Sequence, residues 1–370
     1  YSTFAWAAGE NITHCRIGFL CCLSIKIIKK SGGTIMNARK LFSVLLVLCL
    51  MLQCIPLAAA AEPQADLTEE PITITYPVAI DETNFPDENF RSYVASNFDK
   101  DKDGSLSQAE AEAVTRINVD SLKISDLTGL VYFQNLISLY CNRNQLTELD
   151  VSSSPSLKYL DCSNNQLAKL DVSNNVAIDL LKCSSNQLTE LDVSKNIALT
   201  DLDCGWNQLT ALDVTKNTAL ISLDCAGKML TELDVTKNTA LRYLDCGWGQ
   251  LTALDLTKNT ALTRLDCSGS RLLTELDVTK NTALTYLNCQ QTPLVTLDVS
   301  KNTALTYLDC GWNQLTALDV RNNTALTCLH CNSNQLAELD VSKNTALETL
   351  WCGVNQLAEL DITKNTALTD

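Results

Sequence analysis

Apolar residues recur along this chain in a pattern that repeats about every 21 residues from Leu136 onward. The clearest copy runs from Leu305 to Ala325 and reads LTYLDCGWNQLTALDVRNNTA. A period of this length is typical of a solenoid, in which each unit is one coil that buries its apolar face only against neighbouring coils. The position that opens successive copies holds Leu136, Leu157, Ile178, Leu199, Leu220, Leu241, Leu262, Leu284, Leu305, Leu326, Leu347 and Leu368.

Each copy divides into two halves with the patterns LxxLxCxxNQ and LxxLDVxxNxA. The LxC and LDV triplets alternate between inward and outward positions, which is typical of short strands with one buried face. The sequence therefore predicts two strands per coil and two stacked short parallel sheets. The copy that begins at Leu262 contains an extra residue within 268–273, and we expect this residue to bulge into a loop.

An asparagine follows the cysteine of the first half by three positions in most copies. A buried amide there can bond turn backbones of its own and adjacent coils, which would otherwise be buried without partners. These asparagines are Asn144, Asn165, Asn186, Asn207, Asn313, Asn334 and Asn355. The middle copies hold Lys228, Gly249, Ser270 and Thr292 instead. We expect a looser turn in those copies.

These patterns, LxxLxCxxNxL joined to LxxLDVSxN, resemble the short leucine-rich repeats of bacterial internalin-like surface proteins, over about two thirds of the chain. The resemblance implies a right-handed leucine-rich-repeat solenoid that is mainly β and carries a binding surface for proteins or glycans. Residues 85–115 resemble the small helical cap that precedes such repeats and shields the open edge of the first coil. Residues 116–135 are expected to form an irregular first coil, followed by about eleven repeats over 136–370.

The cap contains a metal-binding pattern, DKDKDGSLSQAE, at residues 99–110. It matches the twelve-residue calcium loop of the EF-hand type, in which alternate oxygen donors wrap around one ion and Gly104 permits the sharp turn. We predict one structural Ca²⁺, because no second such loop accompanies this one. The predicted ligands are Asp99, Asp101, Asp103, Ser105 through its backbone carbonyl, Ser107 and Glu110. The alternative interpretation is an acidic surface turn that binds no ion.

The N-terminal region reads as a processed leader. Residues 36–61 combine a basic start, an apolar run and a small-residue cleavage site, which together indicate a secretory signal peptide. The alternative is an uncleaved membrane anchor, since 41–61 is uncharged and long enough to span a bilayer. We interpret 1–35 as upstream translated sequence and 62–84 as a linker. A secreted or bacterial cell-surface location follows, and the incomplete last repeat indicates a longer protein.

Charge and histidine content exclude several functions. The net charge is −15, and residues 1–61 hold six basic residues and one acid, so the remainder carries −20. Such a balance repels nucleic acid and anionic membrane surfaces, so we expect no nucleic-acid partner and no membrane insertion of the mature chain. Enzyme activity is not expected either, because the chain has only two histidines, His14 and His330, and a narrow solenoid offers no deep pocket.

The chain has 17 cysteines, and eleven of them share one inward position of the repeat, from Cys141 to Cys352. At that position they are predicted to act as small buried hydrophobic residues with free thiols. A zinc site is not expected, because only Cys328 and Cys331 have a CxxC-like spacing, with His330 between them, and a second ligand pair is missing.

Comparison of the copies separates scaffold from candidate binding surface. The aspartate of the LDV triplet is the same in every copy, so it carries no specificity, whereas outward residues of the first half vary and include aromatics. Exposed aromatics beside carboxylates suit a basic protein patch or a sugar. The candidate surface residues are Tyr159, Tyr243, Tyr286, Tyr307, Trp206, Trp248, Trp312 and Trp351. The alternative is that these rings pack on neighbouring turns.

The sequence therefore predicts a recognition or adhesion module for a protein partner. Two other functions remain open at this point, a glycan-binding module of a larger carbohydrate-processing or cell-wall protein and a purely structural stalk.

Overall fold

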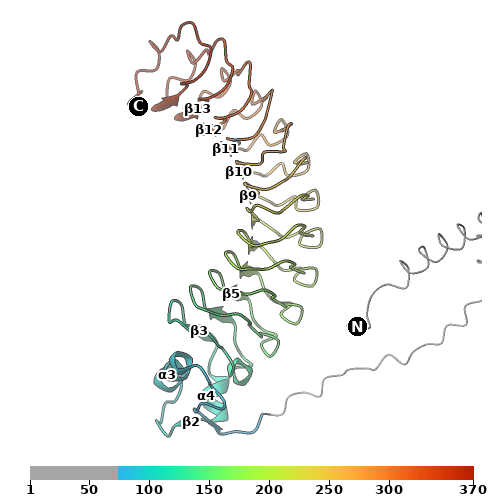
Figure 1. Ribbon diagram of the computed structural model, residues 1–370, viewed down its shortest axis with the longest axis vertical. Helices are drawn as coiled ribbons and strands as arrows, with labels where there is room; N and C mark the ends of the chain where they lie inside the picture. Colours follow the sequence, from blue (N-terminus) through green and yellow to red (C-terminus); the bar gives the residue numbers. More distant parts are fainter. Residues whose placement is uncertain (1–73) are drawn as a thin grey trace, which may run out of the picture. The chain divides into compact units, whose positions relative to one another are not determined.

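The computed structural model describes residues 74–370, which form an arc of stacked coils with a small helical cap at one end (Figure 1). The predictions for 1–35, the signal peptide at 36–61 and most of the linker lie outside the described residues. Within 74–370, no helix is both long enough and apolar enough to cross a membrane.

A single sheet of 12 parallel strands, one per coil, runs through the described part of the chain. The strands lie on the inner side of the arc (Figure 1). Their bounds are β3 Arg116–Asn118, β4 Ser138–Tyr140, β5 Tyr159–Asp161, β6 Leu180–Lys182, β7 Asp201–Asp203, β8 Ser222–Asp224, β9 Tyr243–Asp245, β10 Arg264–Asp266, β11 Tyr286–Asn288, β12 Tyr307–Asp309, β13 Cys328–His330 and β14 Thr349–Trp351. The central residue of each strand points into the core, and the first and third residues point outward.

The prediction of a second sheet was wrong. The LDV segments alternate as expected, and Leu191 and Val193 are buried, but no strand forms there in residues 74–370. Local turns take up the backbone groups instead: Asn196 N donates to Val193 O at 3.0 Å, and Leu199 N donates to Asn196 O at 3.1 Å. The outer half of each coil is therefore a chain of turns, which are closed by hydrogen bonds within the coil.

The predicted asparagine ladder is present. Asn165 donates from Nδ2 to Cys141 O and to Cys162 O, both at 3.0 Å, while its Oδ1 accepts from Leu146 N at 3.0 Å. One amide thus satisfies buried backbone groups of two neighbouring coils, which would otherwise lose hydrogen bonds to water without replacement.

A second asparagine ladder, to which the sequence analysis assigned no role, lies in the outer half of the coils. Asn196 donates from Nδ2 to Val172 O at 3.0 Å and to Asn175 O at 2.9 Å. The same pair of bonds recurs from coil to coil, and the ladder comprises Asn175, Asn196, Asn217, Asn238, Asn259, Asn281, Asn302, Asn323, Asn344 and Asn365. The two ladders together brace both halves of the coils in which the first asparagine is present.

The middle coils lack the first ladder, yet their strands keep register from β8 to β11. Thiols there approach backbone oxygens: Cys225 Sγ lies 3.5 Å from Asp245 O, and Cys246 Sγ lies 3.7 Å from Asp266 O. The loss of the amides therefore changes the turns and leaves the sheet intact. The extra residue in 268–273 is accommodated as predicted, since Leu272 is exposed and β10 still pairs with β11 residue by residue.

All 12 cysteines of the described residues are free, and ten of the eleven at the inward position are buried. Burial raises the pKa of these thiols, for example that of Cys162, because a thiolate is poorly solvated in an apolar interior. The inward cysteines thus act as core residues, as the sequence indicated.

The cap contains α3 (Glu88–Asn97), α4 (Gln108–Glu112) and a two-stranded antiparallel sheet of β1 (Val78–Ala79) and β2 (Ser105–Leu106). Asp87 caps α3, and Ser107 forms a capping box with Glu110 at the start of α4. The part of the predicted linker that is described, 74–84, contains β1 and therefore belongs to the cap.

Aromatic packing joins the cap to the first coil, which contains β3 and the 3₁₀ helix η1 (Leu130–Tyr132). Phe133 of this coil is fully buried, and its ring centroid lies 5.3 Å from Phe98 and 6.4 Å from Phe85. The first coil therefore carries a regular strand and closes the apolar core against the cap.

The outer asparagine ladder generates the first prediction. Asn259→Ala should lower the free energy of unfolding by about 2–4 kcal/mol, because the buried carbonyls of Val235 and Asn238 lose their donor. Lys258→Ala, at the exposed neighbouring position, should change it by about 0.5 kcal/mol or less. Urea unfolding followed by circular dichroism measures both variants, and equal losses would contradict a bracing role for the ladder.

Candidate functional site

Two columns of side chains cover the inner face, because the first and third residues of every strand point outward and the strands align in register. The first column contains Tyr243, Arg264, Tyr286 and Tyr307 on successive strands. The third-residue column places Asp309 beside His330, and His330 beside Trp351. Residues that are 21 or 22 positions apart in the chain thus become lateral neighbours.

Aromatic and cationic side chains form one continuous stack over these columns. The rings of Tyr286 and Tyr307 lie parallel, with centroids 4.4 Å apart and an interplanar angle of 6°. The Arg264 guanidinium lies 3.6 Å above the Tyr286 ring and 5.8 Å from the Tyr243 ring. This placement is a cation–π arrangement, which favours a fixed guanidinium between two rings.

The stack continues toward the C-terminus. The Tyr307 ring meets His330 edge-on at 5.7 Å, and His330 stacks on Trp351 at 4.2 Å with an interplanar angle of 14°. Trp351 is 50% exposed and ends the stack. We call the six side chains the aromatic row, and they are Tyr243, Arg264, Tyr286, Tyr307, His330 and Trp351.

Four aspartates on consecutive strands line the inner face beside the start of the aromatic row. We call Asp203, Asp224, Asp245 and Asp266 the acidic column. Burial, together with the neighbouring charge of Asp245, raises the pKa of Asp224 to about 7. Burial also raises the pKa of Asp245 to about 6, opposed in part by its bond from Gly247 N. Burial and mutual repulsion therefore disfavour the ionised form of these neighbouring carboxylates.

The pKa values of the aspartates in the outer half are lowered, in contrast to those of the acidic column. Asp213 Oδ1 accepts from Thr215 N at 2.9 Å and from Thr215 Oγ1 at 2.7 Å, and these bonds lower its pKa. Equivalent bonds recur along the outer half, for example from Ser194 N to Asp192. The invariance of this aspartate is explained by its role in closing a turn of each coil.

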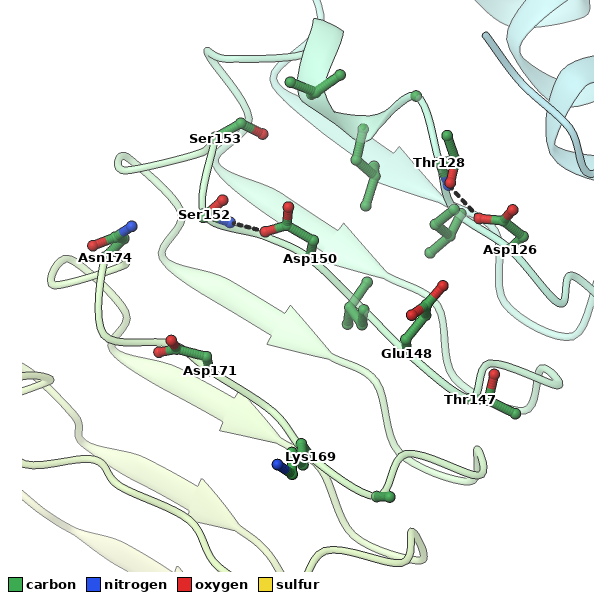
Figure 2. A pocket seen from close by; sticks show the side chains of 16 residues that line it. Asp126, Thr128, Thr147, Glu148, Asp150, Ser152, Ser153, Lys169, Asp171 and Asn174 are labelled. Atoms are coloured by element: carbon green, nitrogen blue, oxygen red, sulfur yellow. Dashed lines mark hydrogen bonds between the residues drawn. The ribbon is translucent and has the colours of Figure 1, made fainter. Parts of the chain in front are cut away.

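Two hollows lie over that outer half. One of about 710 Å³ is lined by Asp126, Glu148, Asp150, Lys169 and Asp171 among others, and Figure 2 shows two of these carboxylates bonded to backbone N–H groups. A second hollow, of about 860 Å³, occupies the equivalent surface at the other end of the array, around Asp319. We interpret both as grooves of the repeat, because the same turn-closing residues line them.

The eight residues predicted as a binding surface fall into three groups. Tyr243, Tyr286, Tyr307 and Trp351 belong to the aromatic row, whereas Tyr159 lies on β5, four strands before Tyr243 on β9. Trp206, Trp248 and Trp312 lie on the turn that follows the strand, with 52%, 40% and 61% of their surface exposed. The alternative of packing on a neighbouring turn holds for Trp248, whose ring fills the space beside Gly269.

The three tryptophans adopt a backbone conformation that bulky residues rarely occupy. Their φ angles are 54°, 61° and 55°, in the left-handed region, where Gly269 sits in an equivalent turn. A non-glycine residue in this region costs about 1 kcal/mol or more.

Sequence reasoning missed Arg264 and His330 as members of the aromatic row. It also missed the contact of His330 with Asp309, whose Oδ2 lies 3.2 Å from His330 Nδ1. The repeat length contained the signal, because equivalent positions in adjacent copies become neighbours across the sheet.

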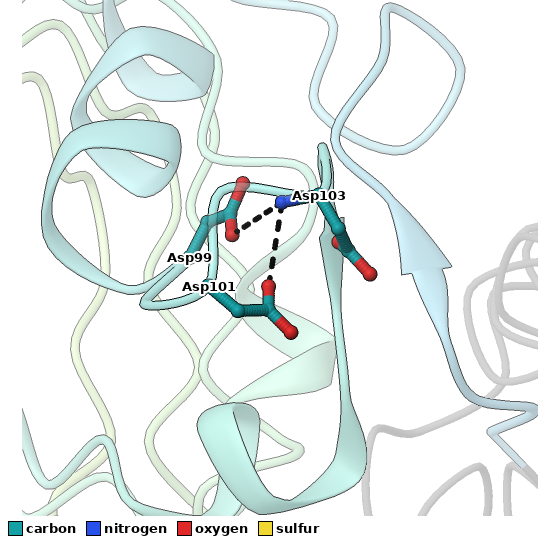
Figure 3. A group of neighbouring side chains, drawn as sticks. All are labelled: Asp99, Asp101 and Asp103. Carbon is teal, nitrogen blue, oxygen red and sulfur yellow. Dashed lines mark hydrogen bonds between the residues drawn. The ribbon is translucent and has the colours of Figure 1, made fainter.

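The predicted calcium loop follows α3 and leads into α4. Oxygens of Asp99, Asp101 and Asp103 lie within 4.8 Å of one another, and Figure 3 shows Asp99 and Asp101 both accepting from Asp103 N. Asp99 also accepts from Gly104 N at 3.0 Å, and Gly104 has a φ of 83°. The loop thus places three carboxylates on one side of a tight turn.

Glu110 closes this loop from α4. Its Oε1 accepts from Lys100 N at 2.6 Å, and its Oε2 accepts from Ser107 N at 2.9 Å and from Ser107 Oγ at 2.7 Å. The backbone bonds from Ser107 and Lys100 lower the pKa of Glu110 to about 2. The remaining predicted ligand, Ser105, lies in β2.

The acidic column generates a pH-dependent prediction. The folded pKa of Asp224 is about 7 against an ordinary value of 3.8, so its stabilising protonated form is complete below about pH 4 and is lost as the pH rises through 7. Asp224→Asn should therefore raise the free energy of unfolding by about 1–2 kcal/mol at about pH 8, after allowance for solvent screening, and leave it unchanged near pH 4.

Asp234→Asn is the matched control for this prediction. Asp234 lies in the same coil, and bonds from the Thr236 hydroxyl and N–H lower its pKa, so the substitution should not stabilise the protein at pH 8. Thermal unfolding between about pH 4 and pH 8 measures both variants. A gain for Asp224→Asn that is the same at every pH would be inconsistent with a charge effect.

Known proteins share both the repeat and the fold. A family model for leucine-rich repeats (2 copies) matches residues 134–175. Internalin J of Listeria monocytogenes serotype 4b (strain F2365) is 42% identical over 70 residues, which are 19% of this chain and 8% of that protein. The solved functional domain of InlJ from L. monocytogenes, which includes a cysteine ladder, matches with a TM-score of 0.77 and 39% identity. That match covers 80% of this chain and 66% of the InlJ domain.

Two more distant structures share the fold alone. The internalin InlF of L. monocytogenes matches with a TM-score of 0.64 at 21% identity. That match covers 79% of this chain and 96% of the InlF chain. A leucine-rich-repeat protein of Leptospira interrogans matches with a TM-score of 0.61 at 23% identity. That match covers 65% of this chain and 67% of the Leptospira chain. The repeat pattern, the cysteine column and these matches identify the chain as an internalin-like leucine-rich-repeat protein.

Proposed function

We propose that this chain is a secreted or surface-displayed bacterial recognition module that binds a protein through its inner face. The observation that carries the proposal is the adjacency of the acidic column and the aromatic row on one sheet. The predicted signal peptide and the similarity to Internalin J support the location. Leucine-rich-repeat modules of this type are generally non-enzymatic, and the role proposed for this face is binding.

The charge of the inner face selects the kind of partner. Burial raises the pKa of Asp224 and the neighbouring charge of Asp245 raises it further, so ionisation of the column carries both a desolvation cost and a repulsive cost near neutral pH. A lysine or arginine side chain placed between these carboxylates would relieve that repulsion and gain charge-assisted hydrogen bonds. A basic protein segment with its own apolar side chains therefore fits the acidic column and the aromatic row together.

The geometry of the row favours a protein over a sugar. The Tyr286 and Tyr307 rings stack on each other, and Arg264 covers the other face of Tyr286, so these rings present their edges to a ligand. Stacking of a sugar needs an exposed ring face. A glycan remains the second candidate because Trp206 and Trp312 expose 52% and 61% of their surface on the turn beside the strands. A purely structural stalk would have no need for such a varied face.

We also infer that the loop at 99–110 binds one structural Ca²⁺. The residues present fit the ion, because Asp99, Asp101 and Asp103 offer hard carboxylate oxygens within 4.8 Å of one another and Ser105, Ser107 and Glu110 complete the twelve-residue pattern. Bound calcium would supply positive charge that neutralises the loop and fixes α3 against α4.

The binding prediction uses a library of random displayed peptides selected on the immobilised chain, in parallel with a glycan array. Selected peptides should be enriched in lysine and arginine. Tyr286→Ala and Tyr307→Ala should each lower the affinity for the best peptide about 30-fold. This is the usual effect of truncating an aromatic anchor that contributes about 2 kcal/mol.

Asp298→Asn and Asp319→Asn are the matched controls, since they lie in the same two coils on the outer half. They should change affinity by less than about threefold. Circular dichroism checks folding. Peptides without basic enrichment, or equal losses from both surfaces, would refute the proposed face. Glycan hits alone would favour the second candidate, and no hits of either kind would favour the stalk.

The calcium prediction uses thermal unfolding with and without the ion. Calcium at about 1 mM should raise the melting temperature of the wild type, because extracellular sites of this kind bind at about 10⁻⁴ to 10⁻³ M. Glu110→Gln keeps the capping box but removes the bidentate carboxylate, so its melting temperature should not respond. Glu112→Gln, at the last residue of α4 and outside the predicted ligand set, should respond like the wild type. Absence of any calcium response in the wild type would refute the site.

A further inference from the structure

Cys328 differs from the cysteine column because it is the first residue of its strand and points outward onto the inner face. Its Sγ lies 3.3 Å from His330 Nε2, two residues along the same strand. His330 Nδ1 lies 3.2 Å from Asp309 Oδ2 on the adjacent strand. A thiol, an imidazole and a carboxylate thus stand in line on the exposed side of the sheet.

The carboxylate fixes the tautomer of the imidazole. Asp309 can only accept at Oδ2, so His330 carries its proton on Nδ1 and presents the lone pair of Nε2 to the thiol. Asp309 is itself held, since its Oδ1 accepts from Gly311 N at 3.0 Å. Trp351 stacks on the imidazole at 4.2 Å and Tyr307 meets its edge at 5.7 Å, so the ring has little freedom to turn away.

The thiol needs this base. Partial burial and the charge of Asp309 raise the pKa of Cys328, so the sulfur is protonated near neutral pH. His330 Nε2 is within reach of that proton, which is the geometry of a nucleophile paired with a general base. The sulfur is only partly buried, in contrast to the inward thiols, and a reagent on the inner face can approach it.

We infer that Cys328 is a nucleophilic thiol that exchanges with a disulfide of a protein bound on the inner face, with His330 as base and Asp309 as positioning residue. The thiol proton passes to Nε2 as Sγ attacks one sulfur of the disulfide. The new Sγ–S bond forms, the old S–S bond breaks, and the leaving thiolate takes the proton back from Nε2. One disulfide and one thiol give one mixed disulfide and one thiol, so no oxidant is required.

Other chemistry fits the cluster less well. Acyl transfer needs N–H donors free to stabilise an oxyanion, but Cys328 N donates to Thr306 O at 3.1 Å and Cys331 N donates to Trp351 O at 2.7 Å. A metal site needs converging ligands, whereas thiol and carboxylate lie on opposite nitrogens of the imidazole. Disulfide exchange needs only the thiol, the base and access.

The identity of the partner disulfide rests on the proposed function, so the test uses a small probe that requires no protein partner. The full chain is incubated with cystamine, a cationic disulfide suited to the acidic inner face, and labelling of each cysteine peptide is followed by mass spectrometry. Cys352 is the internal control, because it is also only partly buried but has no imidazole contact in the described residues. Cys328 should react about 10-fold faster than Cys352 near pH 7.

The variants separate the roles. His330→Asn should lower the rate at which Cys328 reacts with cystamine about 10-fold or more. The remaining rate should rise steeply with pH, since only the ionised thiol then reacts. Asp309→Asn should slow it less. Both asparagines are compatible with this column, where Asn288 already accepts from Gln290 N. The groups that face the imidazole are Cys328, Asp309, Tyr307 and Trp351, and Asp370 accepts from Trp351 Nε1 at 3.2 Å.

Thermal unfolding of each variant tests for a merely structural role, which would change stability without changing the pH profile of labelling. The inference is overturned if Cys328 reacts no faster than Cys352, or if His330→Asn leaves its rate unchanged. Because cystamine labelling and peptide selection are independent measurements, either proposal can fail while the other stands.

Discussion

The need to satisfy buried backbone groups in every coil is the constraint on which this structure depends. A solenoid buries the turns of each coil against its neighbours, so their carbonyl oxygens lose water and must find other donors. Two asparagine ladders supply those donors, as Asn165 does for Cys141 and Cys162, and as Asn196 does for Val172 and Asn175. Each amide bonds a coil to the one before it, and the ladders thereby hold successive coils in register.

This constraint decides where the chain is free to vary. The outer half of each coil is committed to turns closed by an aspartate, such as Asp192 with Ser194, and its sequence hardly changes. Outward residues of the strands have no comparable structural role, because backbone hydrogen bonds and the inward leucines and cysteines hold the sheet together. The sequence therefore varies most at these outward positions. Because the strands pair in register, varied residues on adjacent strands contact each other, as the parallel rings of Tyr286 and Tyr307 do.

The repeat pattern was sufficient to predict the solenoid, the inward cysteines and the extra residue near Leu272. It failed for the second sheet, because alternation reports which side chains are buried and cannot distinguish a strand from successive turns that bury the same residues. The contribution of 74–84 to the cap was missed because β1 pairs with β2 across many intervening residues. Arg264 and His330 were missed because their contacts lie between copies, although alignment of the copies contains that information.

Two features that lower stability lie on the inner face and its rim. Burial and the charges of neighbouring aspartates raise the pKa of Asp224 and Asp245, and exposed tryptophans such as Trp312 occupy left-handed backbone positions. Stability of the coils comes from elsewhere, from asparagines and apolar residues that are fully buried. Because every coil is braced independently of its inner surface, the chain can hold repelling charges, strained turns and a reactive thiol on one face without loss of the fold. Such a division of roles is expected where a surface has been shaped for binding, since a partner of opposite charge would relieve the repulsion that the isolated protein retains.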